Sequence, residues 1–463
     1  MERSKDVHQK ALAVNLDTGK YGTIAEIGAG QETARWFFRV GGAAGTIAKA
    51  MSAYDMQVSD AIYGKAPRYV SRERLVQMLA HEYRLVVERL NEQRGAESTF
   101  FAFANTVAAR SFSRNVNGQG WIGIRFQSAP RAQPSQIDIH VSLKGAQATE
   151  DQETLGILGV NLIYGALHHF DDPDLLLESL MDGLYPELLE VDMIDFDGPA
   201  FTAVDNRAMA LRLVQTGLAP AAMFTADGEV GHVADALYRK AVLVERSRFR
   251  PPTNLTLNML ECAQRQFCAE REVNADNVVV LSEMTLHNLV DGGDVHLQDF
   301  IDRADLLCGL GKNVLISNLG EYYQLAAYLL RFTNMPVGLV LGIPTLAAIF
   351  DETYYDDLPG GILEAFGRLF KNDLRLYVCP GLRADSGIDT ADSFLPAPHL
   401  RHLYAHLLEN RHVRALDGIR EEYLQIISHE VLKKLHDGDP AWEACCPQEV
   451  VTLIRAKSLF SAR

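Results

Sequence analysis

The chain has 463 residues and a formal net charge of -16 at pH 7, with 44 Lys and Arg against 60 Asp and Glu. Hydrophobic residues make up 48% and charged residues 22%, which excludes a mainly disordered chain, and the length exceeds what one hydrophobic core usually serves, so two or three structural units are expected. The sequence has no uncharged apolar run long enough for a transmembrane helix, and its start lacks the apolar segment of a signal peptide, so we expect a cytoplasmic protein without membrane contacts.

Residues 1–98 are predicted to form a mainly helical amino-terminal part. In Glu32–Val40 the aromatic and apolar residues recur at helical spacing, and Gly41 and Gly42 then interrupt the pattern. Ala43–Met51 is rich in small residues and is expected to resume a helix. A longer helix is expected to begin after Ser71, a favourable amino-terminal cap.

Residues 99–150 are predicted to form an antiparallel β segment. Three runs are rich in β-branched and aromatic residues, and loops containing Gly, Pro, Asn and Ser separate them. The expected strands are Phe101–Val107, Trp121–Phe126 and Ile137–Leu143.

Residues 151–395 are predicted to form an α/β domain, and residues 396–463 a set of carboxy-terminal helices. Short apolar runs alternate with amphipathic stretches, the pattern of parallel strands buried on both faces and joined by crossover helices. The expected strands are Leu189–Phe196, Ala221–Thr225, Ala241–Glu245, Val278–Ser282, Val314–Ser317, Val337–Leu341 and Leu374–Cys379.

The fold class expected for this domain is a mostly parallel, doubly wound sheet. A closed β/α barrel is the alternative if Ile157–Tyr164 forms an eighth strand. We favour the open sheet, because residues typical of a helix start precede that stretch. In an open sheet, ligands bind at the carboxyl ends of the strands.

Two acidic residues close the first expected strand of this domain. Asp195 and Asp197 share one face of the strand and precede Gly198 and Pro199, which turn the chain. Paired carboxylates at a strand end can hold Mg²⁺ that bridges phosphates, so both are candidate metal ligands and Asp195 a candidate catalytic residue. The alternative is that they are solvated loop acids that cap the next helix.

Three arginines follow the strand that ends at Glu245. Arg246, Arg248 and Arg250 are candidate ligand-binding residues, because guanidinium groups bind phosphate or carboxylate through paired hydrogen bonds. The alternative is a set of salt bridges to acidic neighbours.

Further polar residues follow the next strands along the chain. Glu283 is the candidate general base, since burial at a strand end can raise the pKa of a carboxylate; the alternative is a helix cap. Ser317 and Asn318 are expected to line the same crevice as ligand-binding residues.

Three segments of the chain resemble a known family. Tyr21–Gly45, Ser52–Gly64 and Gly360–Phe370 are similar to a widespread family of bacterial cytoplasmic proteins whose members carry the labels nicotinate-nucleotide adenylyltransferase or TonB box receptor. An adenylyltransferase of that class has an HxGH-type motif after its first strand. This sequence has none, so the resemblance assigns no catalytic residue.

Charge is unevenly distributed along the chain. Residues 1–131 carry +6 and the remainder -22. The dispersed arginines do not indicate nucleic-acid binding, whereas two oppositely charged parts could join in a homo-oligomer. The leading hypothesis is therefore a cytoplasmic enzyme that transfers a nucleotidyl or phosphoryl group on a nucleotide or phosphorylated metabolite, with Mg²⁺ as cofactor. The alternative is a non-catalytic homo-oligomeric scaffold or filament.

Overall fold

The computed structural model describes residues 5–110, 117–291, 294–383 and 387–460. The chain divides into two compact units: the amino-terminal unit, Met1–Ala219, and the carboxy-terminal unit, Pro220–Arg463. This coarser division does not test the four-part division expected from the sequence, which stays a prediction. None of the helices in the described part of the chain combines the length and apolar character that a membrane span requires.

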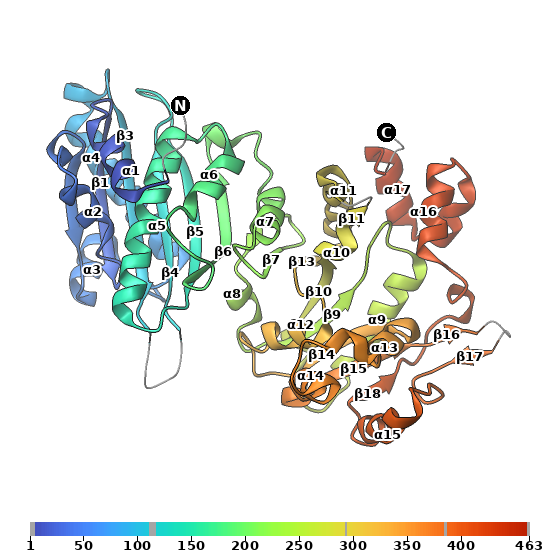
Figure 1. Cartoon of the computed structure of the whole chain (residues 1–463). Helices are drawn as coiled ribbons and strands as arrows, with labels where there is room; N and C mark the ends of the chain where they lie inside the picture. Colours follow the sequence, from blue (N-terminus) through green and yellow to red (C-terminus); the bar gives the residue numbers. More distant parts are fainter. Residues whose placement is uncertain (1–4, 111–116, 292–293, 384–386, 461–463) are drawn as a thin grey trace. The chain divides into compact units, whose positions relative to one another are not determined.

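The amino-terminal unit is built on a mixed sheet (Figure 1). β1 pairs in parallel with β2 and β3, and all later neighbours pair antiparallel. In spatial order the strands are β2 (Ile47–Ser52), β1 (Lys20–Gly28), β3 (Thr99–Ala108), β4 (Gln119–Phe126), β5 (Ser135–Leu143) and β6 (Leu189–Asp197).

Helices cover both faces of this sheet. Gly123 on β4 lies under Leu75 and Leu79 of α4, whereas Phe126, on the opposite face of β4, contacts Phe170 just after α5. The helices of this unit are α1 (Val7–Leu16), α2 (Thr33–Arg39), α3 (Met56–Tyr63), α4 (Arg72–Arg94), α5 (Ala148–His168), α6 (Pro173–Leu180) and α7 (Asn206–Gln215).

Two expectations for this unit are wrong. The expected helix at Ala43–Met51 is a short 3-10 turn, Ala43–Gly45, followed by strand β2, because edge pairing with β1 overrides the helical preference of the small residues. The strand expected at Leu189–Phe196 exists as β6, but it pairs antiparallel with β5 and is not part of the parallel sheet. The three antiparallel strands expected within residues 99–150 are confirmed.

The carboxy-terminal unit contains an open, mostly parallel sheet. Its order is β18 (Val413–Ala415), β15 (Arg375–Cys379), β14 (Val337–Gly342), β9 (Ala241–Arg246), β10 (Val278–Thr285), β13 (Asn313–Ser317), β7 (Ala221–Phe224) and β8 (Val230–Gly231). The six strands from β18 to β13 run parallel. At the end of the sheet β7 pairs antiparallel with β13, and β8 pairs antiparallel with β7. The predicted doubly wound sheet is confirmed, and the stretch Ile157–Tyr164 lies in α5, not in a barrel strand.

Hydrophobic cores lie on both faces of this sheet. On one face, Val244 and Leu339 pack with residues of α12 to α15; on the other, Leu243 and Val340 pack with residues of α9. The helices are α8 (Val233–Leu237), α9 (Asn254–Cys268), α10 (Leu286–Leu289), α11 (Leu297–Gly309), α12 (Tyr322–Leu329), α13 (Ile343–Ile349), α14 (Gly361–Leu369), α15 (Arg401–Glu409), α16 (Ser428–His436) and α17 (Gln448–Lys457). Two small hairpins complete the unit: β11 (Val290–Asp291) with β12 (Asp294–Val295), and β16 (Gly381–Leu382) with β17 (Ile388–Asp389).

The strand order defines where a ligand would bind. From β9 the chain proceeds outward through β10 and β13, then returns to β14 on the other side of β9 and continues through β15 and β18. β9 and β14 are therefore the neighbours at which the winding direction reverses. In sheets of this kind the crevice outside the carboxyl ends of such a pair is the usual ligand site.

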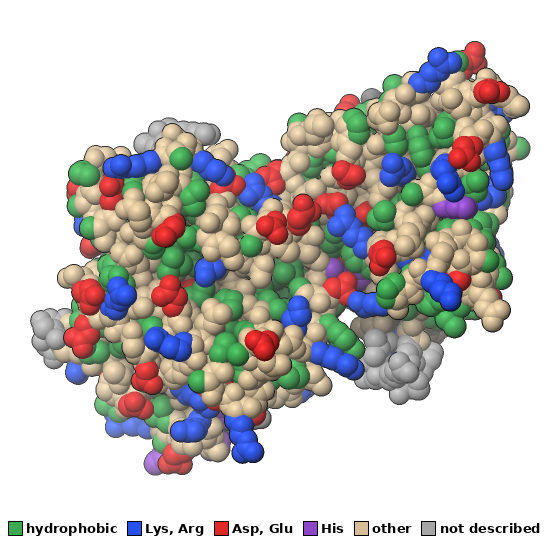
Figure 2. Space-filling model, turned by 180° about the vertical axis from the view of Figure 1, so that it is seen from behind, with side chains coloured by type: hydrophobic (Ala, Val, Ile, Leu, Met, Phe, Trp, Pro, Cys, Tyr) green, Lys and Arg blue, Asp and Glu red, His purple; other side chains and the backbone are tan. Residues whose placement is uncertain are grey.

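Charged side chains are mixed on the face of the molecule shown in Figure 2. Basic and acidic groups lie interspersed among the described side chains of that face. The charge difference between residues 1–131 and the remainder does not produce a patch of one sign there.

Candidate functional site

A cavity of about 640 Å³ lies at the carboxyl edge of the parallel sheet in the carboxy-terminal unit. We call it the sheet-edge cavity. Its wall comes from the segments that follow β9, β10, β13 and β14, so it includes the two strands at which the winding reverses. The lining residues are Arg246, Ser247, Arg248, Thr285, His287, Asn288, Gly320, Glu321, Tyr322, Thr345, Ala348, Ile349 and Tyr354.

Arg246 is held rigidly at the wall of the cavity. Its Nε and Nη2 atoms donate to the two oxygens of the buried Glu283 carboxylate at 2.8 and 2.9 Å. Nη1 and Nη2 also donate to the carbonyls of Gly320 and Leu319, and the guanidinium lies 4.5 Å from the ring centroid of Tyr322. Most of the donors of Arg246 are therefore used within the protein.

Glu283 is a fully buried anchor for this arrangement. Besides Arg246, its Oε1 atom accepts a 2.6 Å hydrogen bond from the Ser317 hydroxyl. These contacts join β9, β10 and β13 at their carboxyl ends. The structure thus brings together three residues that the sequence analysis selected separately, in a network that positions Arg246.

Arg248 differs from its two neighbouring arginines. Its side chain is exposed in the sheet-edge cavity, and none of the described residues hydrogen-bonds or ion-pairs with its guanidinium. Arg250, in contrast, forms a 2.6 Å ion pair with Asp299 on α11. Of the three predicted arginines, Arg248 is the one available to a ligand.

The rest of the wall mixes aromatic, apolar and polar groups. His287 and Tyr354 are exposed at the cavity, and Ile349 and Ala348 add apolar surface. Burial raises the pKa of Tyr322, so its hydroxyl stays neutral. Such a wall fits a ligand that has both a flat or apolar part and an anionic group.

The remaining predicted residues lie elsewhere. Asn318 follows β13, but it is not part of the cavity wall; its backbone N–H donates to Pro220. Asp195 and Asp197 lie on β6, in the sheet of the amino-terminal unit. The expectation that Asp195 and Asp197 end a strand of the parallel sheet is therefore wrong.

Asp195 already has a cationic partner. Arg72 donates to Asp195 and also to Asp138, at 3.0 Å in the latter case, and the Asn206 amide donates to Asp195 at 2.8 Å. Asp197 is exposed at the end of the same strand. The Asp195 carboxylate is thus part of an ion-pair cluster with Arg72 and Asp138, and the metal-ligand role of Asp195 and Asp197 stays a prediction.

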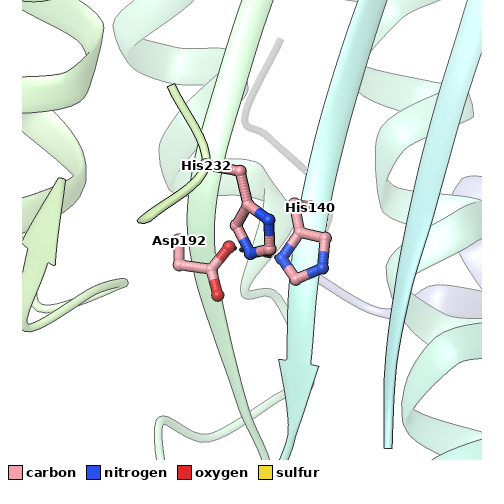
Figure 3. A group of neighbouring side chains, drawn as sticks. All are labelled: His140, Asp192 and His232. Carbon is pink, nitrogen blue, oxygen red and sulfur yellow. Dashed lines mark hydrogen bonds and ion pairs between the residues drawn. The ribbon is translucent and has the colours of Figure 1, made fainter. Parts of the chain in front are cut away.

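A buried histidine in the amino-terminal unit was not selected from the sequence. Nδ1 of His140 on β5 lies 2.5 Å from the carboxylate of Asp192 on β6, and the two side chains meet in Figure 3. Nε2 of His140 lies 2.8 Å from the Gln119 amide oxygen on β4, and Ser142 donates to Asp192 at 2.8 Å. These contacts connect β4, β5 and β6. The signal in the sequence that could have pointed to His140 was the alternation of polar and apolar residues along β5.

Comparisons with known proteins give limited similarity. No protein-family model and no curated protein matches the chain. The solved structures that it resembles include the competence/damage-inducible protein CihA from Agrobacterium tumefaciens, at 17% identity over 36% of this chain and 99% of that chain, with a TM-score of 0.26. A competence or damage-inducible protein from Enterobacter asburiae matches at 13% identity over 35% of this chain and 97% of that chain, with a TM-score of 0.25.

A CinA superfamily protein from Klebsiella pneumoniae matches at 10% identity over 36% of this chain and 99% of that chain, with a TM-score of 0.27. These matches do not confirm the adenylyltransferase label of the family that the sequence resembles. TM-scores this low assign neither a fold nor a function to the chain.

Proposed function

We propose that the carboxy-terminal unit binds a nucleotide or another phosphorylated metabolite in the sheet-edge cavity. The observation that carries the proposal is the exposed guanidinium of Arg248, which has no partner among the described residues and lies at the point where the sheet reverses its winding. A guanidinium binds phosphate oxygens through paired, charge-assisted hydrogen bonds. Arg248 is therefore the proposed phosphate-binding group.

The buried network beneath the cavity supports this assignment. Glu283 and Ser317 hold Arg246, and Arg246 in turn fixes the Gly320 carbonyl and the Tyr322 ring, which both line the cavity. A wall that is fixed before the ligand arrives loses less entropy on binding. We assign Arg246, Glu283 and Ser317 to positioning the wall.

An enzymatic role remains a prediction. The carboxylate of Glu283 accepts three hydrogen bonds, which favours the positioning role over proton transfer. Asp195 and Asp197 belong to the amino-terminal unit, and their role as Mg²⁺ ligands stays a prediction. Ligand binding is the part of the hypothesis that the geometry of the cavity supports.

The test is a thermal-shift and calorimetric titration of the purified protein with nucleotides and sugar phosphates, with and without Mg²⁺. A ligand that binds the native state raises the melting temperature. Arg248→Ala should weaken binding about 10- to 100-fold, the range expected when a hydrogen bond to a charged group is lost. Arg401→Ala, which removes another exposed arginine of the same unit outside the cavity, is the matched control.

Equal affinity in the wild type and Arg248→Ala would contradict the phosphate-binding role of Arg248. A panel in which no phosphorylated compound binds would contradict the proposed function itself.

A further inference from the structure

We infer that the sheet-edge cavity takes a ligand of mononucleotide size with a single phosphate group, bound by side chains, and rejects dinucleotides. The inference rests on the proposed function and defines its ligand class more narrowly. It follows from how this chain departs from the usual construction of a dinucleotide site on the same strand order.

In dinucleotide-binding sheets of this order, the pyrophosphate lies on a glycine-rich turn between the first strand and the next helix. The glycines let the backbone approach the phosphates, and the N–H groups at the start of the helix bind them. The equivalent elements here are β9 and α9. The comparison therefore concerns residues 247–253, which join the two.

The joining segment cannot offer a bare backbone to a pyrophosphate. It reads Ser-Arg-Phe-Arg-Pro-Pro-Thr and contains no glycine. Pro251 and Pro252 have no N–H to donate. Within this segment Phe249 has a positive φ of 48°, a backbone conformation that glycine usually adopts, and its side chain is buried in the core.

The residues at the start of α9 also make contacts away from the sheet-edge cavity. The Thr253 hydroxyl accepts from the Thr256 N–H, and the Asn254 side chain donates to the Ala444 carbonyl. Asn254, with Leu257 and Asn258 of the same helix, lines a different cavity of about 480 Å³. In the described part of the chain, no residue of α9 lines the sheet-edge cavity.

The cavity instead presents the cationic side chain of Arg248 on a loop that a buried arginine holds in place. Arg303 of α11 is 1% exposed, and its Nη1 donates to the carbonyls of Arg248 and Asn288 at 3.0 and 2.9 Å. It also pairs with Asp299, the partner of Arg250. Arg303 thus ties the loop that carries Arg248 to the segment that carries His287.

The volume and the lining residues of the cavity fit a ligand with one ring system and one phosphate group. A volume of about 640 Å³ lies in the range of ordinary small-ligand sites. One phosphate can bind Arg248 and His287, while Tyr322, Ile349 and Tyr354 supply surface for a ring. A second nucleotide would have no glycine turn or helix start to hold its bridging pyrophosphate.

The experiment is isothermal titration of the full chain with a matched series of adenosine, AMP and NAD⁺, repeated with the guanine and uracil nucleosides and their monophosphates. For the base that binds, the monophosphate should bind at least tenfold more tightly than its nucleoside. AMP should also bind at least tenfold more tightly than NAD⁺ if adenine is the preferred base; otherwise NAD⁺ should show no binding.

Arg248→Ala should remove the advantage of the monophosphate over the nucleoside and leave nucleoside binding unchanged, whereas Arg401→Ala should keep that advantage. NAD⁺ binding as tightly as the best monophosphate would overturn the inference and leave the proposed function intact. No binding by any phosphorylated probe, sugar phosphates included, would overturn both. A monophosphate advantage that survives in Arg248→Ala would overturn the assignment to side-chain binding.

Discussion

Glu245 lies next to Arg246 on β9, but consecutive strand residues point to opposite faces of the sheet, so it lies outside the Glu283 network. It is 2% exposed, and its Oε2 atom has no hydrogen-bond partner among the described residues. Burial raises the pKa of Glu245 to about 8, although the nearby charge of Lys312 acts in the opposite direction. The carboxyl group is therefore protonated in the folded protein at neutral pH.

This raised pKa predicts a specific dependence of stability on pH. In the unfolded chain Glu245 ionises near its ordinary value of 4.5, whereas in the folded protein it stays neutral until about pH 8. The neutral group therefore contributes stability that is fully present below the unfolded pKa and is lost as the pH rises through this interval, by up to about 1.4 kcal/mol per pH unit.

Urea unfolding of the wild type and Glu245→Gln between pH 5 and 9 measures this loss, since the amide keeps the shape and cannot ionise. The stability of the wild type relative to the variant should fall as the pH rises toward 8. Parallel pH curves for the two proteins would show that Glu245 has an ordinary pKa.

At the scale of elements, Lys10 joins three helical segments of the amino-terminal unit. Its fully buried ammonium on α1 donates to Asn161 on α5 at 2.9 Å and to the Ser179 carbonyl on α6 at 3.0 Å. It also pairs with Asp182, just after α6, at 2.7 Å. One side chain thus connects α1 to both helices that follow β5.

Lys10→Met should destabilise the amino-terminal unit by about 3–5 kcal/mol, because it leaves the buried Asp182 carboxylate without its cation. The control is Arg84→Met, which breaks an exposed ion pair with Glu88 on α4 of the same unit and should cost about 1 kcal/mol or less. Chemical denaturation of both variants gives the comparison. Equal losses would mean that the Lys10 contacts contribute no more than a surface ion pair.

The elements also show which parts of the fold the sequence predicts. β9, β10, β13, β14 and β15 were recognisable because strands buried on both faces are continuous apolar runs. β2 was missed because Ala, Lys and Met within it favour a helix locally, whereas its strand conformation depends on pairing with β1. The three-residue β18 is too short to give a pattern.

Contacts between residues far apart in the sequence also limit what the sequence predicts about the site. The position of Arg246, Arg248 and Glu283 at the carboxyl edge followed from the strand pattern. The sequence did not show which arginine is free, because that depends on the partners of the other two: Glu283 lies 37 residues after Arg246, and Asp299 lies 49 residues after Arg250. His140 was missed because its partner Asp192 lies on a strand that was assigned to the wrong sheet.

At the scale of the whole molecule, the chain consists of two units, each with its own sheet and helices. Units with separate cores generally unfold as separate cooperative steps. Scanning calorimetry should therefore show two transitions, and a ligand of the sheet-edge cavity should raise only the one that belongs to the carboxy-terminal unit.

Two variants assign the transitions. Lys10→Met should lower the melting temperature of the amino-terminal unit, and Arg248→Ala should reduce the ligand-induced shift of the carboxy-terminal unit. A single transition that moves as a whole with ligand would show that the two units unfold together.

The bracing of the loop by Arg303 has a consequence for how this cavity can change. The side chains that hold the loop, Arg250 and Arg303 with Asp299, are distinct from the exposed side chain of Arg248. The path of the loop and the charge that it offers to a ligand therefore depend on different residues. A substitution at position 248 can alter which ligands are attracted while the path of the loop is preserved, so new ligand preferences can arise on this scaffold without a cost in folding.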